Sequence, residues 1–227
     1  MGEKRNGVAV IMLAVLFCLL FVSGTCADEQ GIFVVTYSHD MEEIISEKFI
    51  NFDEIESSMK AIGAPDGKLL SFQGPTFNKE NLWDVEQTLN IDGLQATIIG
   101  VPILELLEYA DVSEDAINIT FVASDGYKKT LPANIFFTVP DKQGEGVLAY
   151  WYGEDEGTLP DHYGFRLFFN APDGIFGNTD MKETLPEAYW RWYYDNAGQT
   201  KYPSAKGLSV MQVTKLHVQM PAGESGI

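Results

Sequence analysis

Short runs of β-branched and aromatic residues, separated by turn residues, recur along most of this chain and constrain its fold more than any other feature. Residues 31–38 (GIFVVTYS), 145–153 (EGVLAYWYG) and 165–170 (FRLFFN) are typical of β-strands. Two more such runs flank the turn residues Asp125 and Gly126. These runs do not alternate regularly with long helical segments. The sequence therefore predicts an α+β fold, a β-rich mixed single domain with a few helices, rather than an alternating βαβ array.

Other segments carry weaker signals. Apolar residues recur at helical spacing over residues 40–62 and predict an acidic helix there. Pro102 lies near the start of an amphipathic pattern in residues 98–112, which predicts a helix, because the first turn of a helix tolerates proline. Residues 80–91 are expected to continue into a strand, and residues 208–218 are expected to form the last strand. Residues 174–203 contain Gly, Asn and Pro and are expected to be irregular.

The first residues have the order of a secretory signal. Lys4 and Arg5 precede an uncharged apolar run over residues 7–22, and small residues follow up to Ala27. The apolar run is shorter than the roughly 20 residues that span a bilayer comfortably. We therefore expect residues 1–27 to be a cleaved signal peptide, and the protein to be secreted or extracytoplasmic, at the cell surface or in a periplasm, with no stable membrane span. A retained anchor and a lipid on Cys26 are the alternatives.

Cysteine is confined to this first segment. The chain has two cysteines, Cys18 and Cys26. Cleavage near Ala27 would leave about 200 residues, enough for one domain with a sizeable core. That mature chain would have no disulfide, no thiolate metal ligand and no cysteine nucleophile.

The charge of the chain limits its partners. The sequence has 15 basic and 33 acidic residues, a net charge of −18. Without Glu3, Lys4 and Arg5 the counts become 13 and 32, a net charge of −19. Such a chain repels phosphate backbones, so nucleic acid is not expected as a partner. A small molecule or another protein remains as the expected partner, of unknown identity.

Three segments, in order, resemble a known family. They are residues 100–132, which open on GVP and end in DGYKKTLP, residues 147–174 (VLAYWYGEDEGTLPDHYGFRLFFNAPDG), and residues 207–218 (GLSVMQVTKLHV). Together they are similar to the molybdopterin-binding domain of the sulfite oxidase family. The resemblance covers roughly residues 82–218. It implies a molybdopterin-binding-like domain over residues 81–220 with an aromatic insertion at about 175–203, preceded by a strand and acidic helix region over residues 28–80.

The resemblance also implies a cofactor and a departure from the family. Active members hold molybdopterin, and a cysteine thiolate shortly before the GVP segment ligates the molybdenum. Asn90 occupies the corresponding position here, with Gly93 three residues later. An amide is a poor ligand for a high-valent metal, whereas a thiolate is a good one. We therefore do not expect conventional oxygen-atom transfer, and we expect no metal ligand from the mature chain.

Arg166 and its neighbours are the remaining site residues that the resemblance implies. In the family, a histidine or tyrosine before a glycine and an arginine just beyond it contact the pterin phosphate. His162, Tyr163 and Arg166 match these positions, although the spacing is one residue shorter, so either His162 or Tyr163 could take the first role. The guanidinium fork suits a phosphate. The alternative is a strand-edge arginine that pairs with Glu154, Asp155, Glu156 or Asp161.

An aromatic cluster is the last candidate. Residues 189–194 read YWRWYY, five aromatic residues around Arg191. Exposed rings could stack a sugar or a flat heterocycle. The alternative is that the rings cover the core or form a subunit interface.

Two functions follow. The first is an exported molybdopterin-binding, sulfite oxidase-like oxidoreductase domain with a redox role, degenerate at its metal ligand. The second is a non-catalytic extracytoplasmic binding or interaction module on the same scaffold.

Overall fold

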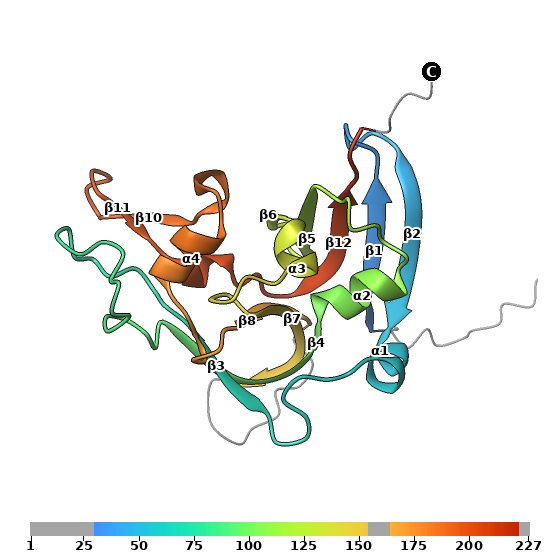
Figure 1. Cartoon of the computed structure of the whole chain (residues 1–227), viewed down its shortest axis with the longest axis horizontal. Coiled ribbons are helices and arrows are strands. Elements are labelled where there is room, and N and C mark those ends of the chain that lie inside the picture. The colour runs from blue at the N-terminus through green and yellow to red at the C-terminus, as the bar shows by residue number, and fades with distance from the viewer. Residues whose placement is uncertain (1–29, 154–163, 223–227) are drawn as a thin grey trace, which may run out of the picture.

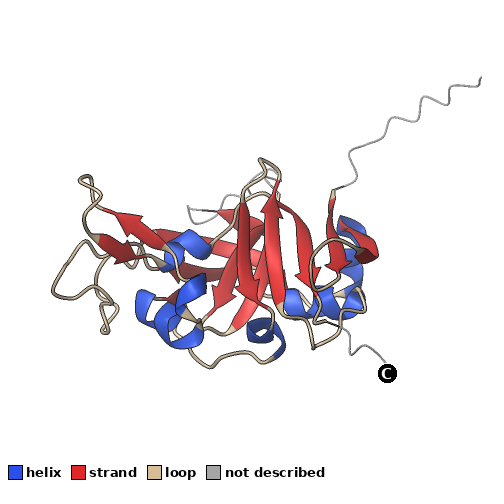
Figure 2. Cartoon of the chain, turned by 90° about the horizontal axis from the view of Figure 1, so that it is seen from above, coloured by secondary structure: helices blue, strands red, loops and turns tan. Residues whose placement is uncertain are grey.

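Two five-stranded sheets and several short helices make up the part of the chain that the structure describes, residues 30–153 and 164–222. The structure is a computed structural model. Figure 2 shows the strands in the middle of the molecule and the helices toward its periphery. The described residues form one β-rich α+β domain, which confirms the fold class expected from the sequence.

The first sheet joins the beginning of the described chain to its end. Its strand order is β2-β1-β12-β5-β6. Strands β1 and β12 are parallel, with Val35 opposite His217, and the other neighbours are antiparallel. In Figure 1 these strands stand on the right of the molecule. The strands are β1 (Gly31–Tyr37), β2 (Ile44–Asn51), β5 (Asn118–Ala123), β6 (Lys128–Pro132) and β12 (Val213–Gln219).

The second sheet has the order β8-β7-β4-β3-β9. Strands β3 and β9 are parallel, and the other neighbours are antiparallel. The fully buried ring of Phe72 lies with its centroid 5.9 Å from Phe168 and 5.8 Å from Phe176. Such ring pairs stabilise the core on this side. The strands are β3 (Lys68–Phe72), β4 (Leu94–Pro102), β7 (Glu145–Gly153), β8 (Arg166–Asn170) and β9 (Ile175–Phe176).

The helices are short, and a third, two-stranded sheet projects beside one of them. Figure 1 shows β10 and β11 next to α4, on the side of the molecule away from β1 and β2. The helices are α1 (Phe52–Ser58), α2 (Ile103–Tyr109), α3 (Asn134–Phe137) and α4 (Asn178–Thr184), with 3-10 turns η1 (Glu187–Tyr189) and η2 (Ala205–Leu208). The hairpin strands are β10 (Trp192–Tyr194) and β11 (Lys201–Pro203).

Several local predictions are confirmed. Helix α2 starts directly after Pro102 and buries Ile103, Leu106 and Leu107, although residues 98–102 of the expected helical pattern belong to a strand, β4. Strands β5 and β6 flank the expected turn, where Gly126 has a φ of +87°. A left-handed backbone of this kind favours glycine. The strands expected near residues 31–38, 145–153, 165–170 and 208–218 are β1, β7, β8 and β12.

The prediction of an acidic helix over residues 40–62 is wrong for the first half of that range. Residues 44–51 form β2, which pairs antiparallel with β1 at the edge of the first sheet. The helix begins only at Phe52, where Asn51 and Glu54 form a reciprocal capping box. Ile44 and Ile45 are 53% and 59% exposed, so their helical spacing does not reflect a buried face.

Two further expectations need correction. Residues 80–91 form no strand but a series of turns, in which Asp84, Gln87 and Asn90 have φ values of +48°, +49° and +48°. Residues 174–203 were expected to be irregular, yet they contain β9, α4, η1, β10 and β11. Both segments are held by side-chain hydrogen bonds that link positions far apart in the sequence. Local patterns do not reveal such bonds.

Candidate functional site

Arg166 is a buried residue, not a solvated surface charge. It opens β8 opposite Ala149 of β7 and is 5% exposed. Its Nε donates a hydrogen bond to Ser209 Oγ at 3.0 Å. The guanidinium carbon lies 5.5 Å from the ring centroid of Tyr152 and 5.6 Å from that of Phe168. These contacts fix the orientation of the planar guanidinium.

The expected neighbours of Arg166 lie outside the described residues. His162 and Tyr163, and the carboxylates of Glu154, Asp155, Glu156 and Asp161, all belong to residues 154–163. The phosphate site and the strand-edge ion pair that the sequence suggested therefore both stay predictions. Within the described residues, Arg166 contacts Ser209, Tyr152 and Phe168.

Asn90 holds two loops together. It is exposed and has a φ of +48°, a conformation that asparagine tolerates better than most residues. Its carbonyl accepts from the Gly74 amide at 2.9 Å, and its Nδ2 donates to the Pro75 carbonyl at 3.0 Å. A Cβ on Gly74 would displace the Asn90 side chain from this position. The side-chain amide of Asn90 is thus committed to a turn.

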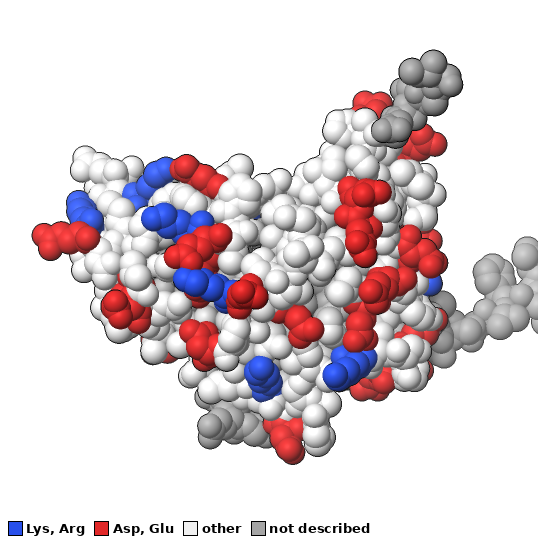
Figure 3. Space-filling model, viewed as in Figure 1, with Lys and Arg blue, Asp and Glu red and all other residues white. Residues whose placement is uncertain are grey.

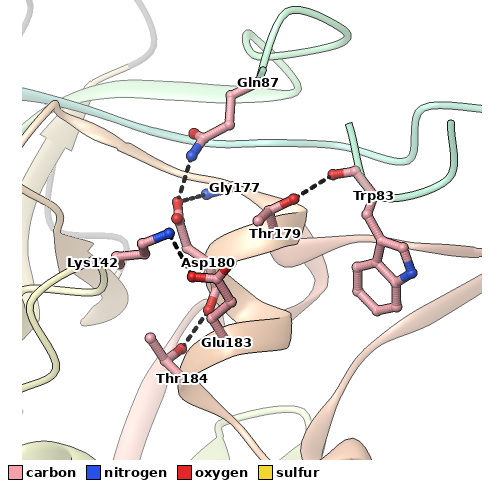
Figure 4. A network of polar contacts seen from close by, with 8 residues as sticks. All are labelled: Trp83, Gln87, Lys142, Gly177, Thr179, Asp180, Glu183 and Thr184. Atoms are coloured by element: carbon pink, nitrogen blue, oxygen red, sulfur yellow. Dashed lines mark hydrogen bonds and ion pairs between the residues drawn. The ribbon is translucent and has the colours of Figure 1, made fainter. Parts of the chain in front are cut away.

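A buried carboxylate fastens the loop of residues 75–93 to α4. Asp180 is 4% exposed and accepts from the Gly177 amide at 2.8 Å and from Gln87 Nε2 at 2.9 Å. Figure 4 shows both bonds, together with the ion pair between Lys142 and Glu183 nearby. Burial raises the pKa of the Asp180 carboxyl, and the two donors oppose that rise.

A second group of buried polar side chains continues this network. Gln73 Nε2 donates to Asp84 Oδ2 at 2.6 Å, and the Asn178 amide donates to Gln73 Oε1 at 2.8 Å. Asn178 also donates from Nδ2 to the Gly74 carbonyl at 2.9 Å and accepts from the Ala205 amide at 2.8 Å. Since Gln73, Asp84 and Asn178 are fully buried, these bonds anchor three segments to each other without water.

The network positions a cluster of three tryptophans. The ring centroids of Trp83 and Trp190 lie 4.8 Å apart, and those of Trp83 and Trp192 lie 5.6 Å apart. The third pair, Trp190 and Trp192, is separated by 5.8 Å. All three pairs are edge-to-face, and all three rings are half-buried. Thr179 Oγ1 donates to the Trp83 carbonyl at 2.9 Å and fixes the backbone at this ring (Figure 4).

Exposed apolar side chains lie in the same two segments as this cluster. Phe77 and Val85 are 61% and 68% exposed, and Tyr193 and Tyr194 are 42% and 63% exposed. Phe77 packs edge-on against Tyr202, at 5.3 Å between centroids. We call residues 75–93 together with residues 187–204 the aromatic lobe. Exposed apolar side chains that gather in one region are a feature of many interaction sites.

Cations lie over the ring faces of this region. Lys201 Nζ is 4.4 Å from the Trp192 centroid, and Lys182 Nζ is 5.0 Å from the Trp83 centroid. The Arg191 guanidinium carbon is 5.9 Å from the centroid of Tyr193. Figure 3 shows blue side chains among red ones around α4 and β10, while the side of α1, α2 and β2 is dominated by acidic side chains. Favourable cation–π contacts thus place positive charge at the surface of the aromatic lobe.

A lysine anchors the aromatic lobe to the first sheet. Lys129 Nζ on β6 donates to the Tyr189 carbonyl at 2.6 Å, and Tyr189 donates its hydroxyl to Asn118 Oδ1 at 2.7 Å. Burial, and next the positive charge of Arg191, lower the pKa of Lys129 to about 8. Two alternatives were open for residues 189–194, exposed rings or rings that cover the core. Tyr189 and Trp190 pack against the core, whereas Tyr193 and Tyr194 are exposed.

Sequence reasoning found the YWRWYY segment but missed its partner. Trp83 was assigned to a strand, and nothing in its local pattern links it to Trp190 or Trp192. The clearest available signal was composition, because three of the chain's four tryptophans belong to this cluster. The buried Gln73 and Asn178 carried no signal, since polar residues are usually exposed.

Comparison with known proteins assigns no family. No family model matches the chain, and no curated protein matches it. Among residues 30–153 and 164–222, no three histidine, cysteine, aspartate or glutamate side chains are grouped so that they could hold a metal ion. Within the same ranges no helix has both the length and the apolar character needed to cross a bilayer.

Proposed function

We propose that this chain is an exported, non-catalytic binding domain whose ligand-contacting surface is the aromatic lobe. Export is supported by the basic start and the apolar run of residues 7–22. The observation that carries the binding role is the exposure of Phe77, Val85, Tyr193 and Tyr194 in the two segments that also carry the tryptophan cluster. Exposed apolar surface costs solubility, and a partner that covers it would recover that cost.

The lobe is built to keep its shape without a ligand. Its first segment is fixed to α4 by bonds from Gln87 to Asp180 and from Thr179 to the Trp83 carbonyl. Its second segment is fixed to the first sheet by the bond from Lys129 to the Tyr189 carbonyl. Binding to a surface already fixed loses less conformational entropy than binding to a loose loop. A lobe held by these bonds therefore loses little conformational entropy when it binds, which supports a recognition role for its exposed side chains.

A molybdopterin-dependent oxidoreductase on a sulfite oxidase-like scaffold is the other candidate. Its metal needs a soft ligand from the protein, and the described residues contain no cysteine. Asn90, at the expected ligand position, donates its amide to the Pro75 carbonyl. Arg166 keeps a guanidinium of the kind that contacts phosphate, but its Nε is bonded to Ser209. The residues present do not fit a thiolate-ligated molybdenum, so we assign the chain no redox step.

Position-specific crosslinking tests the binding role. A photoreactive amino acid replaces Tyr194 in one variant and Leu69 of β3 in another, and both are expressed in the native host. The two positions are 63% and 50% exposed, so nonspecific capture should affect both. We expect a discrete crosslinked species at position 194 and none at position 69. Equal labelling at the two positions, or none at either, would contradict a binding role for the aromatic lobe.

Metal analysis tests the competing function. The chain is purified from a host that makes molybdopterin, and molybdenum and released pterin are measured per mole of protein. We expect amounts far below one of each. Stoichiometric molybdenum would overturn the non-catalytic assignment.

A further inference from the structure

The β10–β11 hairpin leaves one strand edge available for another chain. The Ser204 amide donates to the Arg191 carbonyl at 2.9 Å, and the Asp195 amide donates to the Thr200 carbonyl at 2.8 Å. Because antiparallel pairs alternate between bonded and non-bonded positions, the amide and carbonyl of Trp192 and Tyr194 point away from β11. None of the described residues bonds these outward groups.

The other edge of the hairpin is less suited to pairing. On β11 the outward positions are Lys201 and Pro203, since they lie opposite Tyr194 and Trp192. Proline has no backbone N–H, so Pro203 cannot donate to an added strand. The edge of β10 therefore remains, and an extended peptide can add there as a third strand through main-chain hydrogen bonds.

The basic side chains beside β10 favour an acidic occupant. Residues 174–209 hold four basic and four acidic side chains, whereas residues 75–93, which pack on β10 through Trp83, hold one basic and four acidic side chains. Two of the four acids in residues 174–209 are offset, because Asp180 is buried and Glu183 pairs with Lys142. Asp195 accepts from the Gln199 amide at 2.8 Å, and hydrogen bonds to its carboxylate lower its pKa, so it stays negatively charged.

The basic side chains beside β10 are not paired with carboxylates of the residues that the structure describes. Lys182, Arg191 and Lys201 form no ion pair with a described carboxylate and instead lie over aromatic rings. Lys201 lies opposite Tyr194 on one face of the hairpin, and Arg191 lies over Tyr193 on the other face. A peptide beside β10 meets positive charge whichever way its acidic side chains point.

The ring geometry disfavours a sugar at this surface. A sugar stacks on an open ring face, but the faces of Trp83, Trp192 and Tyr193 are approached by Lys182, Lys201 and Arg191. The three tryptophans also pack edge-to-face rather than as one flat platform. A peptide needs only the edge of the strand and the flanking side chains.

We propose that the free edge of β10 binds an extended acidic segment of a protein partner, which adds to the hairpin as a third strand. This inference rests on the proposed binding role of the aromatic lobe and specifies its ligand class. Main-chain bonds at Trp192 and Tyr194 supply alignment, and Lys201 and Arg191 select acidic side chains.

Fluorescence anisotropy with defined peptides tests the proposal. The probe is a labelled heptapeptide, Glu-Val-Glu-Val-Glu-Val-Glu, titrated with the full chain. A second peptide has lysine in place of every glutamate, and a third has proline in place of the central valine. We expect the first peptide to bind at least about tenfold more tightly than either control, because one control reverses the charge and the other removes a main-chain donor. Equal affinity for the proline peptide would overturn strand addition.

Matched protein variants test the site. Lys201→Glu should weaken binding of the acidic peptide about tenfold, and added salt should weaken binding to the native chain. Lys215→Glu is the control, since Lys215 Nζ also lies over a ring, 5.2 Å from the Phe33 centroid, but on β12. Unchanged affinity in Lys201→Glu, or an equal loss in Lys215→Glu, would refute the site. As a control for folding, urea unfolding of each variant is compared with that of the native chain.

Two other results separate the possible failures. If the native chain forms a dimer that Lys201→Glu dissociates, the occupant is a second copy, and the proposal of an acidic partner is wrong. If crosslinking at Tyr194 succeeds but the acidic peptide does not bind, the binding role stands and the present inference fails alone.

Discussion

Asn178 is the position where one substitution should reveal how the aromatic lobe is anchored. Its fully buried side chain donates to the Gly74 carbonyl at 2.9 Å and accepts from the Ala205 amide at 2.8 Å. Asn178→Ala removes both bonds and leaves both backbone groups buried and unpaired. Each unpaired group costs about 1–3 kcal/mol, so the free energy of unfolding should fall by about 2–6 kcal/mol. Such a loss is a large fraction of the roughly 5–15 kcal/mol that stabilises a typical domain.

Urea unfolding followed by tryptophan fluorescence measures this loss. With a slope of about 2 kcal/mol per M, a loss of about 3 kcal/mol moves the midpoint down by about 1.5 M. The control is Asn134→Ala, at the exposed first residue of α3, which should change stability by less than about 0.5 kcal/mol. A loss below about 1 kcal/mol in Asn178→Ala would refute the view that these bonds hold the segments together without water.

Two other predictions follow from burial and from backbone geometry. Burial raises the pKa of Asp180 above its unfolded value of 3.8, so this carboxyl lowers stability at neutral pH, and that cost disappears as the pH falls through the raised pKa. The free energy of unfolding of the native chain, measured relative to Asp180→Asn, should therefore increase on acidification, and a parallel pH dependence would contradict this. Gly144→Ala should destabilise the fold by more than Gly126→Ala, because φ is positive at both, +66° and +87°, but only at Gly144 does a Cβ collide with the Asn170 carbonyl. Equal losses in thermal unfolding would show that backbone strain alone decides the effect.

The sequence predicted those elements whose signal is local. Strands β5 and β6 combine β-branched residues with an Asp-Gly turn, and α2 follows a proline that suits its start. The helix predicted for residues 44–51 was wrong because the spacing of Ile44 and Ile45 resembles that of a helical face. Pairing with β1 makes this segment a strand. β-propensity depends on neighbouring strands, and a single segment does not contain that information.

The candidate site was also predictable only where its signal is local. Arg166 was predicted at the start of a strand, where the structure places it, but its burial against Ser209 and Tyr152 depends on two other segments of the chain. The aromatic run of residues 189–194 was visible in the sequence, whereas its contact with Trp83 depends on the turns that precede β4. Single residues could be selected from the sequence, but their grouping could not.

The placement of polar residues explains why the aromatic lobe suits recognition. An apolar lobe of the same size could have been held by burying its rings, yet Tyr193 and Tyr194 would then be inaccessible to a partner. Here amide and carboxylate groups of Gln73, Asp84 and Asn178 carry the anchoring beneath the lobe. Because hydrogen bonds are directional, they fix position while leaving the outer rings exposed. It follows that substitutions in this network should weaken partner binding and stability together, whereas Lys201→Glu should weaken binding alone.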